Sequence, residues 1–600
     1  MRGNGRSCRN AGSGGRRRVE RGNPQSGPWQ ARVNRRVPRG YSSWLVEAST
    51  GCTSRRRRHH QGDPTARGIA GKRQNVSSSN PSHTPPSSAA RAPRERRGRR
   101  LRVGDVTVVD RSMMRRAISG TIVGNTMEWY DVGVYGYLAV TMGKVFLPTA
   151  EPSVQILFSL GVFAATYIAR PLGGIVFGRL GDKLGRQKIL ATTLIMMASS
   201  TFLIGVLPDY ALVGVLGPVL LVLLKLVQGF STGGEYAGAT TFISEYSPDR
   251  KRGFFASFLD AGSYTGFALG AAVVSLLQVL AGSEAMVEWA WRIPFLLAGP
   301  VGAIAIYFRL KIEESPAFQA TQDAQASASS EIADLQGRPR NVFVLIARHW
   351  RPLLLAMAIV AASNIVGYAL TSYMPTYLTD TLGYDPLHGT LLTIPVLILL
   401  AVIMPIAGRI SDRVGRRPVL LAGAIVTIVF SVPAFLLIGL GTVPTTLAGL
   451  SLLALMVALW VCNQASALPA MFPTSARYGA MGIAFNVAIA VFGGTTPLII
   501  QFLIEVTKND LAPAWFLMGA SVVGAIGPIL MKESAKRPLP GALPAVESEE
   551  EARDLVEHQD ENPYLDLSTM PLEQLDAAHQ ARLEADAERG AREPVGSGVS

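Results

Sequence analysis

Residues 178–188 of this 600-residue chain read GRLGDKLGRQK, and residues 408–418 read GRISDRVGRRP. Five residues of the first loop recur 230 positions later, namely Gly178, Arg179, Asp182, Gly185 and Arg186. A second echo follows, because EYSPDRKRG at 245–253 and MFPTSARYG at 471–479 share a proline and an arginine 225 positions apart. An internal repeat on this scale predicts a chain built from two similar halves.

Apolar stretches long enough to cross a bilayer recur around both loops. A membrane-spanning helix needs about 20 apolar residues. The stretches are continuously apolar rather than alternating, which predicts helices and not a β-barrel. We therefore predict an all-α membrane protein with twelve transmembrane helices in two six-helix halves. The predicted spans are 117–138, 155–178, 189–207, 217–243, 253–280, 291–310, 352–376, 388–410, 419–438, 444–467, 478–503 and 512–531.

The charge of the chain is concentrated at its two ends. Only 17% of all residues are charged and the mean hydropathy is +0.24, which argues against a soluble enzyme. Residues 1–112 carry 25 Arg and one Lys against six acidic residues, whereas residues 541–600 carry four basic and 15 acidic residues. The net charge of +15 therefore gives no indication of nucleic-acid binding by the body.

These shifts in composition divide the chain into five parts. We predict a disordered leader at 1–112, a first half at 113–310, a central loop at 311–350, a second half at 351–535 and an acidic tail at 536–600. In the tail, only about 572–588 has the composition of a helix, and it is too short for a stable coiled coil.

The Arg-rich leader has no apolar periodicity, so it cannot bury enough surface to fold. It is interpreted as a transit peptide, as an RNA- or lipid-binding arm, or as translated upstream sequence before a wrongly assigned start. We favour the third interpretation because lysine is almost absent beside so many arginines. In addition, Met113 and Met114 directly precede two arginines and an apolar stretch.

Basic residues in short loops predict the orientation of the chain in the membrane. If the N-terminus is cytoplasmic, the inside loops carry nearly all of the basic residues, and the outside loops carry mainly Lys144 and Lys508 among acidic residues. We therefore expect a multi-pass protein of the inner (plasma) membrane with both termini in the cytoplasm. The basic residues of the inside loops are Arg179, Lys183, Arg186, Lys188, Arg250, Lys251, Arg252, Arg309, Lys311, Arg409, Arg413, Arg416, Arg417 and Arg477.

Several motifs of the body resemble those of a known family. The repeated DxxGR loop is similar to the signature of the major facilitator superfamily, and the finer motifs resemble its metabolite:proton symporters, most closely those of proline and glycine betaine. The resemblance covers residues from about 115 to 540 and leaves out the leader. The motifs are GNTMEWYDVGVYG (124–136), RPLGGIVFGRLGDKLGRQK (170–188), QGFSTGGEYAGA (228–239), EYSPDRKRGF (245–254), WRIPF (291–295) and FPTSARYG (472–479).

Charged residues inside apolar spans are costly, about 2.5–3.5 kcal/mol each at the bilayer centre, and therefore indicate function. Glu128, Asp131 and Tyr135 share one face of the first predicted helix, and the fourth carries Lys225, Gln228, Thr232 and Glu235 on one face. We predict that Asp131, Glu235 or Glu128 carries a coupled proton. The alternative is internal ion pairing, for instance of Lys225 with a carboxylate. Asp260, on the fifth helix, is interpreted as a helix cap or a cytoplasmic gate.

The solute is predicted to bind beside these carboxylates. Trp129, Tyr130 and Tyr135 are candidates for a cation–π contact with an ammonium group, although aromatic residues in membrane proteins are often interfacial. Lys225, Gln228 and Arg170 are candidates for the remaining solute contacts.

The two repeated loops are predicted to act as gates. The resemblance implies that Asp182 and Asp412, with Arg186 and Arg416, contact neighbouring helix ends when the protein is closed to the cytoplasm. An aspartate at a helix N-terminus is favoured by the helix dipole. The basic residues of these loops also fit a simpler role as topological anchors.

We predict a secondary active transporter, not an enzyme, that couples protons to import of a zwitterionic compatible solute such as proline or glycine betaine. Alternatives are a proton symporter of an organic acid (α-ketoglutarate, citrate or shikimate) and a non-transporting osmosensor. Three cysteines, no histidine in the middle of an apolar stretch and no GxxxxGK[ST] loop predict neither metal, nor other cofactor, nor direct use of ATP. The expected partners are the solute, protons and membrane lipid, with no nucleic acid, and the monomer is the expected functional unit.

Overall fold

Apolar helices make up most of the computed structural model, which describes residues 100–184, 186–311, 342–570 and 572. Each of the twelve predicted spans coincides with a helix or a run of helices in this part of the chain. Among the described residues, nine runs are long and apolar enough to cross a membrane by length and composition, and shorter apolar helices cover Thr192–Val206 and Arg292–Ile304. The predicted fold class is therefore confirmed.

The first half contains six spans, several of them divided by short breaks. The break between α7 and α8 falls at two successive glycines, Gly233 and Gly234. The elements are α1 (Arg111–Tyr137), α2 (Ala139–Phe146), α3 (Pro152–Ile168), α4 (Arg170–Leu184), α5 (Arg186–Val206), α6 (Tyr210–Val213), α7 (Leu216–Thr232), α8 (Glu235–Tyr246), η2 (Asp249–Lys251), α9 (Arg252–Ala285), η3 (Met286–Ala290) and α10 (Arg292–Lys311).

The second half repeats this plan. Its first helix starts at Val342, earlier than the predicted 351, with a kink at His349. The elements are α13 (Val342–Tyr368), η4 (Ala369–Tyr373), α14 (Met374–Thr376), η5 (Tyr377–Thr381), α15 (Pro386–Val414), α16 (Arg416–Gly439), α17 (Val443–Val461), α18 (Gln464–Ala467), η6 (Pro469–Met471), α19 (Thr474–Ala488), η7 (Ile489–Gly493), α20 (Thr496–Thr507), α21 (Ala512–Gly524) and α22 (Ile526–Leu530).

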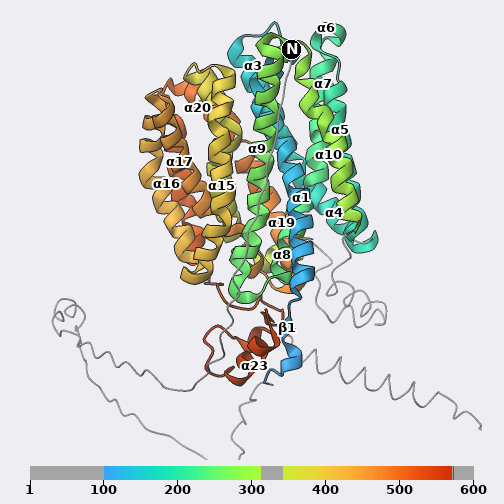
Figure 1. Cartoon of the computed structure of the whole chain (residues 1–600), viewed down its shortest axis with the longest axis vertical. Coiled ribbons are helices and arrows are strands. Elements are labelled where there is room, and N and C mark those ends of the chain that lie inside the picture. Colours follow the sequence, from blue (N-terminus) through green and yellow to red (C-terminus); the bar gives the residue numbers. More distant parts are fainter. Residues whose placement is uncertain (1–99, 185, 312–341, 571, 573–600) are drawn as a thin grey trace, which may run out of the picture. The chain divides into compact units, whose positions relative to one another are not determined.

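The two halves meet along α9 and α15, which pack against one another, while α9 also packs against α1. Figure 1 shows the first half in blue to green and the second half in yellow to orange on either side of this contact. Helices α9 and α16 begin, and α15 ends, at the same end of the bundle. We call it the basic end, because the basic segments 247–252 and 408–418 lie there.

A small module lies at the basic end. It contains η1 (Val103–Asp105), β1 (Thr107–Val108), β2 (Ala545–Val546), α23 (Glu549–Glu557) and η8 (Leu567–Thr569). The two strands pair in parallel, with Thr107 opposite Ala545 and Val108 opposite Val546.

Two predictions about the ends of the chain need correction. The leader was expected to be unstructured through residue 112, but residues 100–112 are folded, and Leu101, Val106 and Val109 are buried against the tail. Their partners lie more than 400 residues away, so local periodicity could not reveal them. The tail forms α23 before 572, because Ser548 accepts a hydrogen bond from the Glu551 backbone and three glutamates favour the helix N-terminus. The predictions for 1–99 and for most of 572–588 lie outside the described residues.

Candidate functional site

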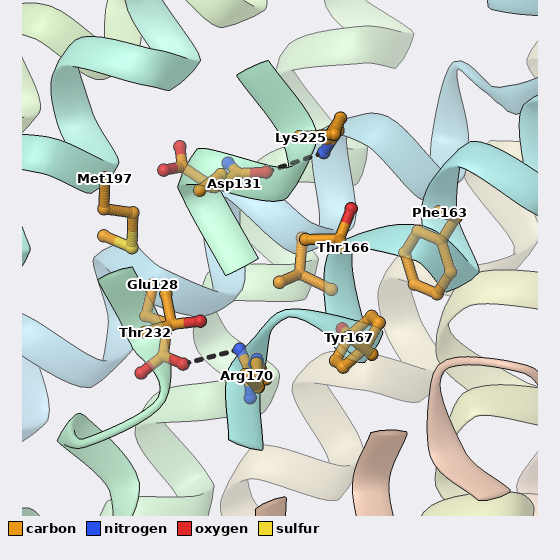
Figure 2. A pocket seen from close by; sticks show the side chains of 11 residues that line it. Glu128, Asp131, Phe163, Thr166, Tyr167, Arg170, Met197, Lys225 and Thr232 are labelled. Carbon is orange, nitrogen blue, oxygen red and sulfur yellow. Dashed lines mark hydrogen bonds and ion pairs between the residues drawn. The ribbon is translucent and has the colours of Figure 1, made fainter. Parts of the chain in front are cut away.

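A pocket inside the first half brings together five of the predicted polar residues. Glu128 and Asp131 come from α1, Arg170 from α4, and Lys225 and Gln228 from α7. None of the five is more than 4% exposed. We call this pocket the first-half pocket. Phe163, Thr166, Tyr167, Met197 and Thr232 also line it (Figure 2).

Two polar systems share the first-half pocket. Arg170 Nη2 forms an ion pair with Glu128 Oε1 at 2.8 Å. In the second system, Lys225 Nζ donates to Gln228 Oε1 at 2.9 Å and lies 4.0 Å from the centre of the Tyr135 ring.

Asp131 is joined to the second system through a hydroxyl group. Gln228 Nε2 donates to Thr201 Oγ1 at 2.7 Å. The Thr201 hydroxyl in turn donates to Asp131 Oδ2 at 2.9 Å. The other oxygen, Asp131 Oδ1, is buried and accepts no hydrogen bond from any described residue. A carboxylate in this setting is costly while it is ionised, so it is suited to taking up a proton.

Close contact of α7 with α3 and α4 places these charges next to one another. A Cβ atom on Gly229 would overlap the carbonyl oxygen of Thr166, and one on Gly173 would overlap that of Phe230. Small residues let membrane helices approach closely, so the motifs RPLGG and QGFSTGG account for this crossing.

A second cavity lies between the two halves and is largely aromatic. We call it the central cavity; its volume of about 40 Å³ has space for only a few water molecules. A solute therefore needs the halves to move apart before it can enter. The described residues that line it include one carboxylate, Asp260, and neither lysine nor arginine. They are Trp129, Tyr236, Asp260, Ser263, Tyr264, Phe267, Ser363, Asn364, Gly367, Tyr368, Thr371, Val461, Gln464 and Phe485.

The predicted aromatic candidates separate in the structure. Trp129 lines the central cavity, 5.4 Å from Phe267 and 6.1 Å from Tyr368 between ring centres. Tyr130 lines neither cavity and donates to the carbonyl oxygen of Pro294 at 3.0 Å. Tyr135 donates to the carbonyl oxygen of Ser159 at 3.2 Å, while its ring faces Lys225.

The remaining predicted residues lie elsewhere. Glu235 is buried at the start of α8 and lines neither cavity. Asp182 and Arg186 belong to α4 and α5, and their side chains lie outside the described part of the structure. Asp260 lies more than two turns inside α9, so its interpretation as a helix cap was wrong.

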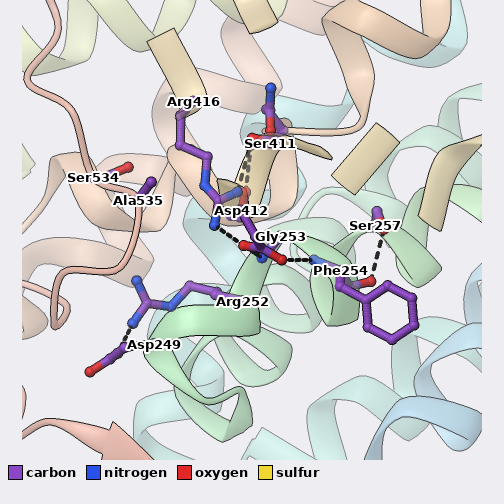
Figure 3. A network of polar contacts seen from close by, with 12 residues as sticks. Asp249, Arg252, Gly253, Phe254, Ser257, Ser411, Asp412, Arg416, Ser534 and Ala535 are labelled. Atoms are coloured by element: carbon purple, nitrogen blue, oxygen red, sulfur yellow. Dashed lines mark hydrogen bonds and ion pairs between the residues drawn. The ribbon is translucent and has the colours of Figure 1, made fainter. Parts of the chain in front are cut away.

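Asp412, in the last turn of α15, contacts the start of α9, where the two halves meet at the basic end (Figure 3). Its Oδ1 accepts from the Gly253 backbone N–H and its Oδ2 from that of Phe254, both at 2.8 Å. Arg416 Nη2 donates to Asp412 Oδ1 at 2.6 Å, and Arg416 Nη1 donates to Ser411 Oγ at 2.9 Å. We call these five residues the gating network, after the role that the sequence predicts for Asp412 and Arg416.

Glu533 supports the gating network from beyond the last span. Its carboxylate accepts backbone N–H groups of Arg416 and Arg417, at 2.9 and 3.0 Å, and also those of Ser534 and Ala535. Burial raises the pKa of Glu533, but these hydrogen bonds outweigh that effect, and the pKa lies below its ordinary value. Glu533 thus serves as an acceptor at the N-terminus of α16.

Sequence reasoning missed the role of several polar residues. Thr201 connects Asp131 to Gln228, and Asn364 and Gln464 line the central cavity from the second half. Each is a polar residue within a mainly apolar stretch, and this pattern could have indicated its role from the sequence. Which cavity such a residue lines depends on the rotation of its helix, and that is decided by packing.

Comparisons with known proteins agree with this architecture. Residues 117–542 match the model of the family described as "Sugar (and other) transporter". The chain is 50% identical over 477 residues to the ectoine/proline transporter ProP of Corynebacterium glutamicum, covering 79% of this chain and 94% of that protein. It is 47% identical over 458 residues to the proline/betaine transporter of Escherichia coli K12, covering 76% and 91%.

Solved structures show the same fold. The proton:xylose symporter XylE of the major facilitator superfamily, bound to 6-bromo-6-deoxy-D-glucose, matches with a TM-score of 0.58 and 17% sequence identity. The match covers 71% of this chain and 98% of the symporter.

Proposed function

The chain belongs to the Sugar (and other) transporter family of the major facilitator superfamily, and we propose that it couples protons to the import of a small zwitterionic compatible solute. Proline, glycine betaine and ectoine are the solutes that the names of its relatives suggest. Import then proceeds by alternating access, with the solute bound in the central cavity.

The charge of the central cavity is the observation that carries the choice of solute. A dicarboxylate such as α-ketoglutarate or citrate needs a cation beside it, and the described lining residues supply none. Lys225 and Arg170 were predicted to contact the solute, but they lie in the first-half pocket with partners of their own. A zwitterion suits a cavity that has one carboxylate, aromatic rings and neutral amides.

Asp131 is the proposed proton carrier. It is almost completely buried and has one oxygen without a described hydrogen-bond partner. Glu128 is a weaker candidate, because its ion pair with Arg170 favours the charged form. Lys225 and Gln228 then serve the proton site rather than the solute.

The orientation is part of the proposal. The basic end is the cytoplasmic side under the positive-inside rule, so both termini lie in the cytoplasm and the gating network closes the cytoplasmic entrance. We propose the plasma membrane as the location and the monomer as the functional unit.

Transport by purified protein in liposomes tests the proposed function. With an imposed proton gradient, the wild type is expected to accumulate labelled proline or glycine betaine. Asp131→Asn is expected to lose accumulation and keep counterflow exchange, because exchange needs no net proton step. Glu284→Gln, which changes an exposed carboxylate of α9, is the matched control and is expected to behave as the wild type.

Two results would contradict parts of this proposal. Normal accumulation by Asp131→Asn at wild-type expression would remove Asp131 as the proton carrier. Competition by α-ketoglutarate or citrate, without competition by betaine, would replace the zwitterion with an organic acid.

A further inference from the structure

We infer that Asp260, held by Tyr236, is the recognition site for the positively charged nitrogen of the solute and selects zwitterions over analogues of the same shape that lack this positive charge. This inference rests on the proposed function and names the group in the central cavity that recognises the charged nitrogen of the solute.

Asp260 is placed to bind a cation. Its carboxylate is 3% exposed, and Oδ1 accepts a hydrogen bond from the Tyr236 hydroxyl at 3.1 Å. Its second oxygen, Oδ2, is buried and has no hydrogen-bond partner among the described residues. A buried carboxylate without a counter-charge is costly, and a bound ammonium group removes that cost.

Tyr236 is itself fixed in position. Its ring stacks on Phe485 of α19, with ring centres 4.0 Å apart and an angle of 12° between the planes. Its hydroxyl also lies 3.4 Å from Gln464 Oε1. Since Phe485 and Gln464 belong to the second half, the tyrosine positions Asp260 against a surface that both halves build.

Aromatic rings complete the site for an alkylated nitrogen. Trp129, Phe267 and Tyr368 lie within one cluster, and all three line the same cavity as Asp260. Aromatic faces attract quaternary ammonium groups, most strongly where the contact excludes water. The cavity thus offers both a negative charge and ring faces to one end of a zwitterion.

Neutral amides on the second half suit the other end. Asn364 Nδ2 donates to the Val360 carbonyl oxygen at 2.8 Å, and a primary amide has a second N–H to offer. Gln464, which contacts Ser363, lines the cavity as well. A carboxylate is bound there without a lysine or arginine.

The test compares glycine betaine with 3,3-dimethylbutanoate, in which carbon replaces the charged nitrogen. The shape and the carboxylate stay nearly the same, so the positive charge is the main difference. Inhibition of labelled betaine exchange in liposomes measures the preference. We expect the wild type to prefer betaine by at least about tenfold, since a contact of about 1.4 kcal/mol already gives that factor.

Asp260→Asn is expected to reduce this preference to within about threefold, while Asp260→Glu restores part of it. Asp131→Asn is the contrasting variant, because it is expected to lose accumulation and keep the preference. If Asp260→Asn exchanges no solute, the shift in melting temperature that each compound causes in purified protein measures the same preference.

The inference is overturned if Asp260→Asn retains the wild-type preference in exchange or in melting temperature. If that variant loses accumulation alone, Asp260 acts in proton transfer and not in recognition. If the wild type neither binds nor accumulates betaine, the proposed function fails first.

Discussion

Single carboxylates at helix N-termini organise the basic end of this protein. Asp412 accepts two backbone N–H groups at the start of α9, and Glu533 accepts those of Arg416 and Arg417 at the start of α16. The first turn of a helix leaves its N–H groups without intrahelical acceptors, so an anion there is stabilised by hydrogen bonds and by the dipole. Glu533 thereby holds Arg416, which in turn donates to Asp412.

Replacing Glu533 with glutamine is expected to destabilise the protein in a pH-dependent manner. The pKa of Glu533 is lowered in the folded protein, so its stabilising contribution is complete above the unfolded value of about 4.3 and is lost as the pH falls through the folded value. Melting temperatures of purified wild type and Glu533→Gln should therefore differ at pH 7 and converge toward pH 3.5.

Glu550→Gln, at an exposed position of α23, is the matched control and should not change the melting temperature. An equal difference at pH 7 and pH 3.5 would show that the charge of Glu533 is not the source of its effect.

At the scale of elements, glycines set how closely α9 and α15 approach. A Cβ atom on Gly253 would lie 2.7 Å from the carbonyl oxygen of Gly408 and would overlap the guanidinium of Arg416. A Cβ atom on Gly408 would meet Gly253 and Ser257 in the same way. α9 and α15 can therefore approach this closely at the basic end because both positions lack side chains.

Gly253→Val is expected to keep the basic end open while leaving each half folded. The side chain enters the contact between the halves and not the core of either one. In a variant without native cysteines, Ser257→Cys is expected to resist a membrane-impermeant maleimide, because Ser257 is buried at this contact. Adding Gly253→Val should make it react several times faster.

Gly519→Val is the control for Gly253→Val, because a Cβ atom there meets nothing within 4 Å. If Ser257→Cys reacts with the maleimide at the same rate with and without Gly253→Val, this contact does not close the basic end.

At the scale of the whole molecule, the small module at the basic end joins both ends of the described chain to both halves. Leu101 is 2% exposed, and its N–H donates to Gln559 Oε1 at 2.9 Å. The Ala545 N–H donates to Asp249 Oδ2 at 3.0 Å in the first half. On the second half, Arg477 Nη2 donates to the Pro540 carbonyl oxygen at 2.9 Å.

Truncation separates the module from the rest of the N-terminal extension. A chain that starts at Met113 loses β1 and the buried side chains of Leu101, Val106 and Val109, each worth about 1.5–3 kcal/mol when fully buried. We expect its tail to become sensitive to trypsin at Lys536 and Arg553, with a lower melting temperature.

A chain that lacks only residues 1–99 keeps every described contact and should match the full chain in both measurements and in uptake. Equal trypsin resistance of the two truncated proteins would show that residues 100–112 do not hold the tail.

Hydropathy and the internal repeat alone determined the twelve helices, their division into two halves and the loops at their ends. Those signals are local, since an apolar run must form a helix in lipid whatever its neighbours are. Glu128 and Asp131 on α1, and Lys225 and Gln228 on α7, also line one pocket, because face spacing on each helix is read directly from residue numbers.

Only the tertiary structure decided which polar residues share a cavity. Tyr236, which donates to Asp260, meets Gln464 and Phe485 across the two halves, while Lys225 lies over the ring of Tyr135 inside the first half. The burial of Leu101 against the tail arose in the same way. These contacts join segments hundreds of residues apart, and helix rotation and packing, which no local pattern encodes, determine them.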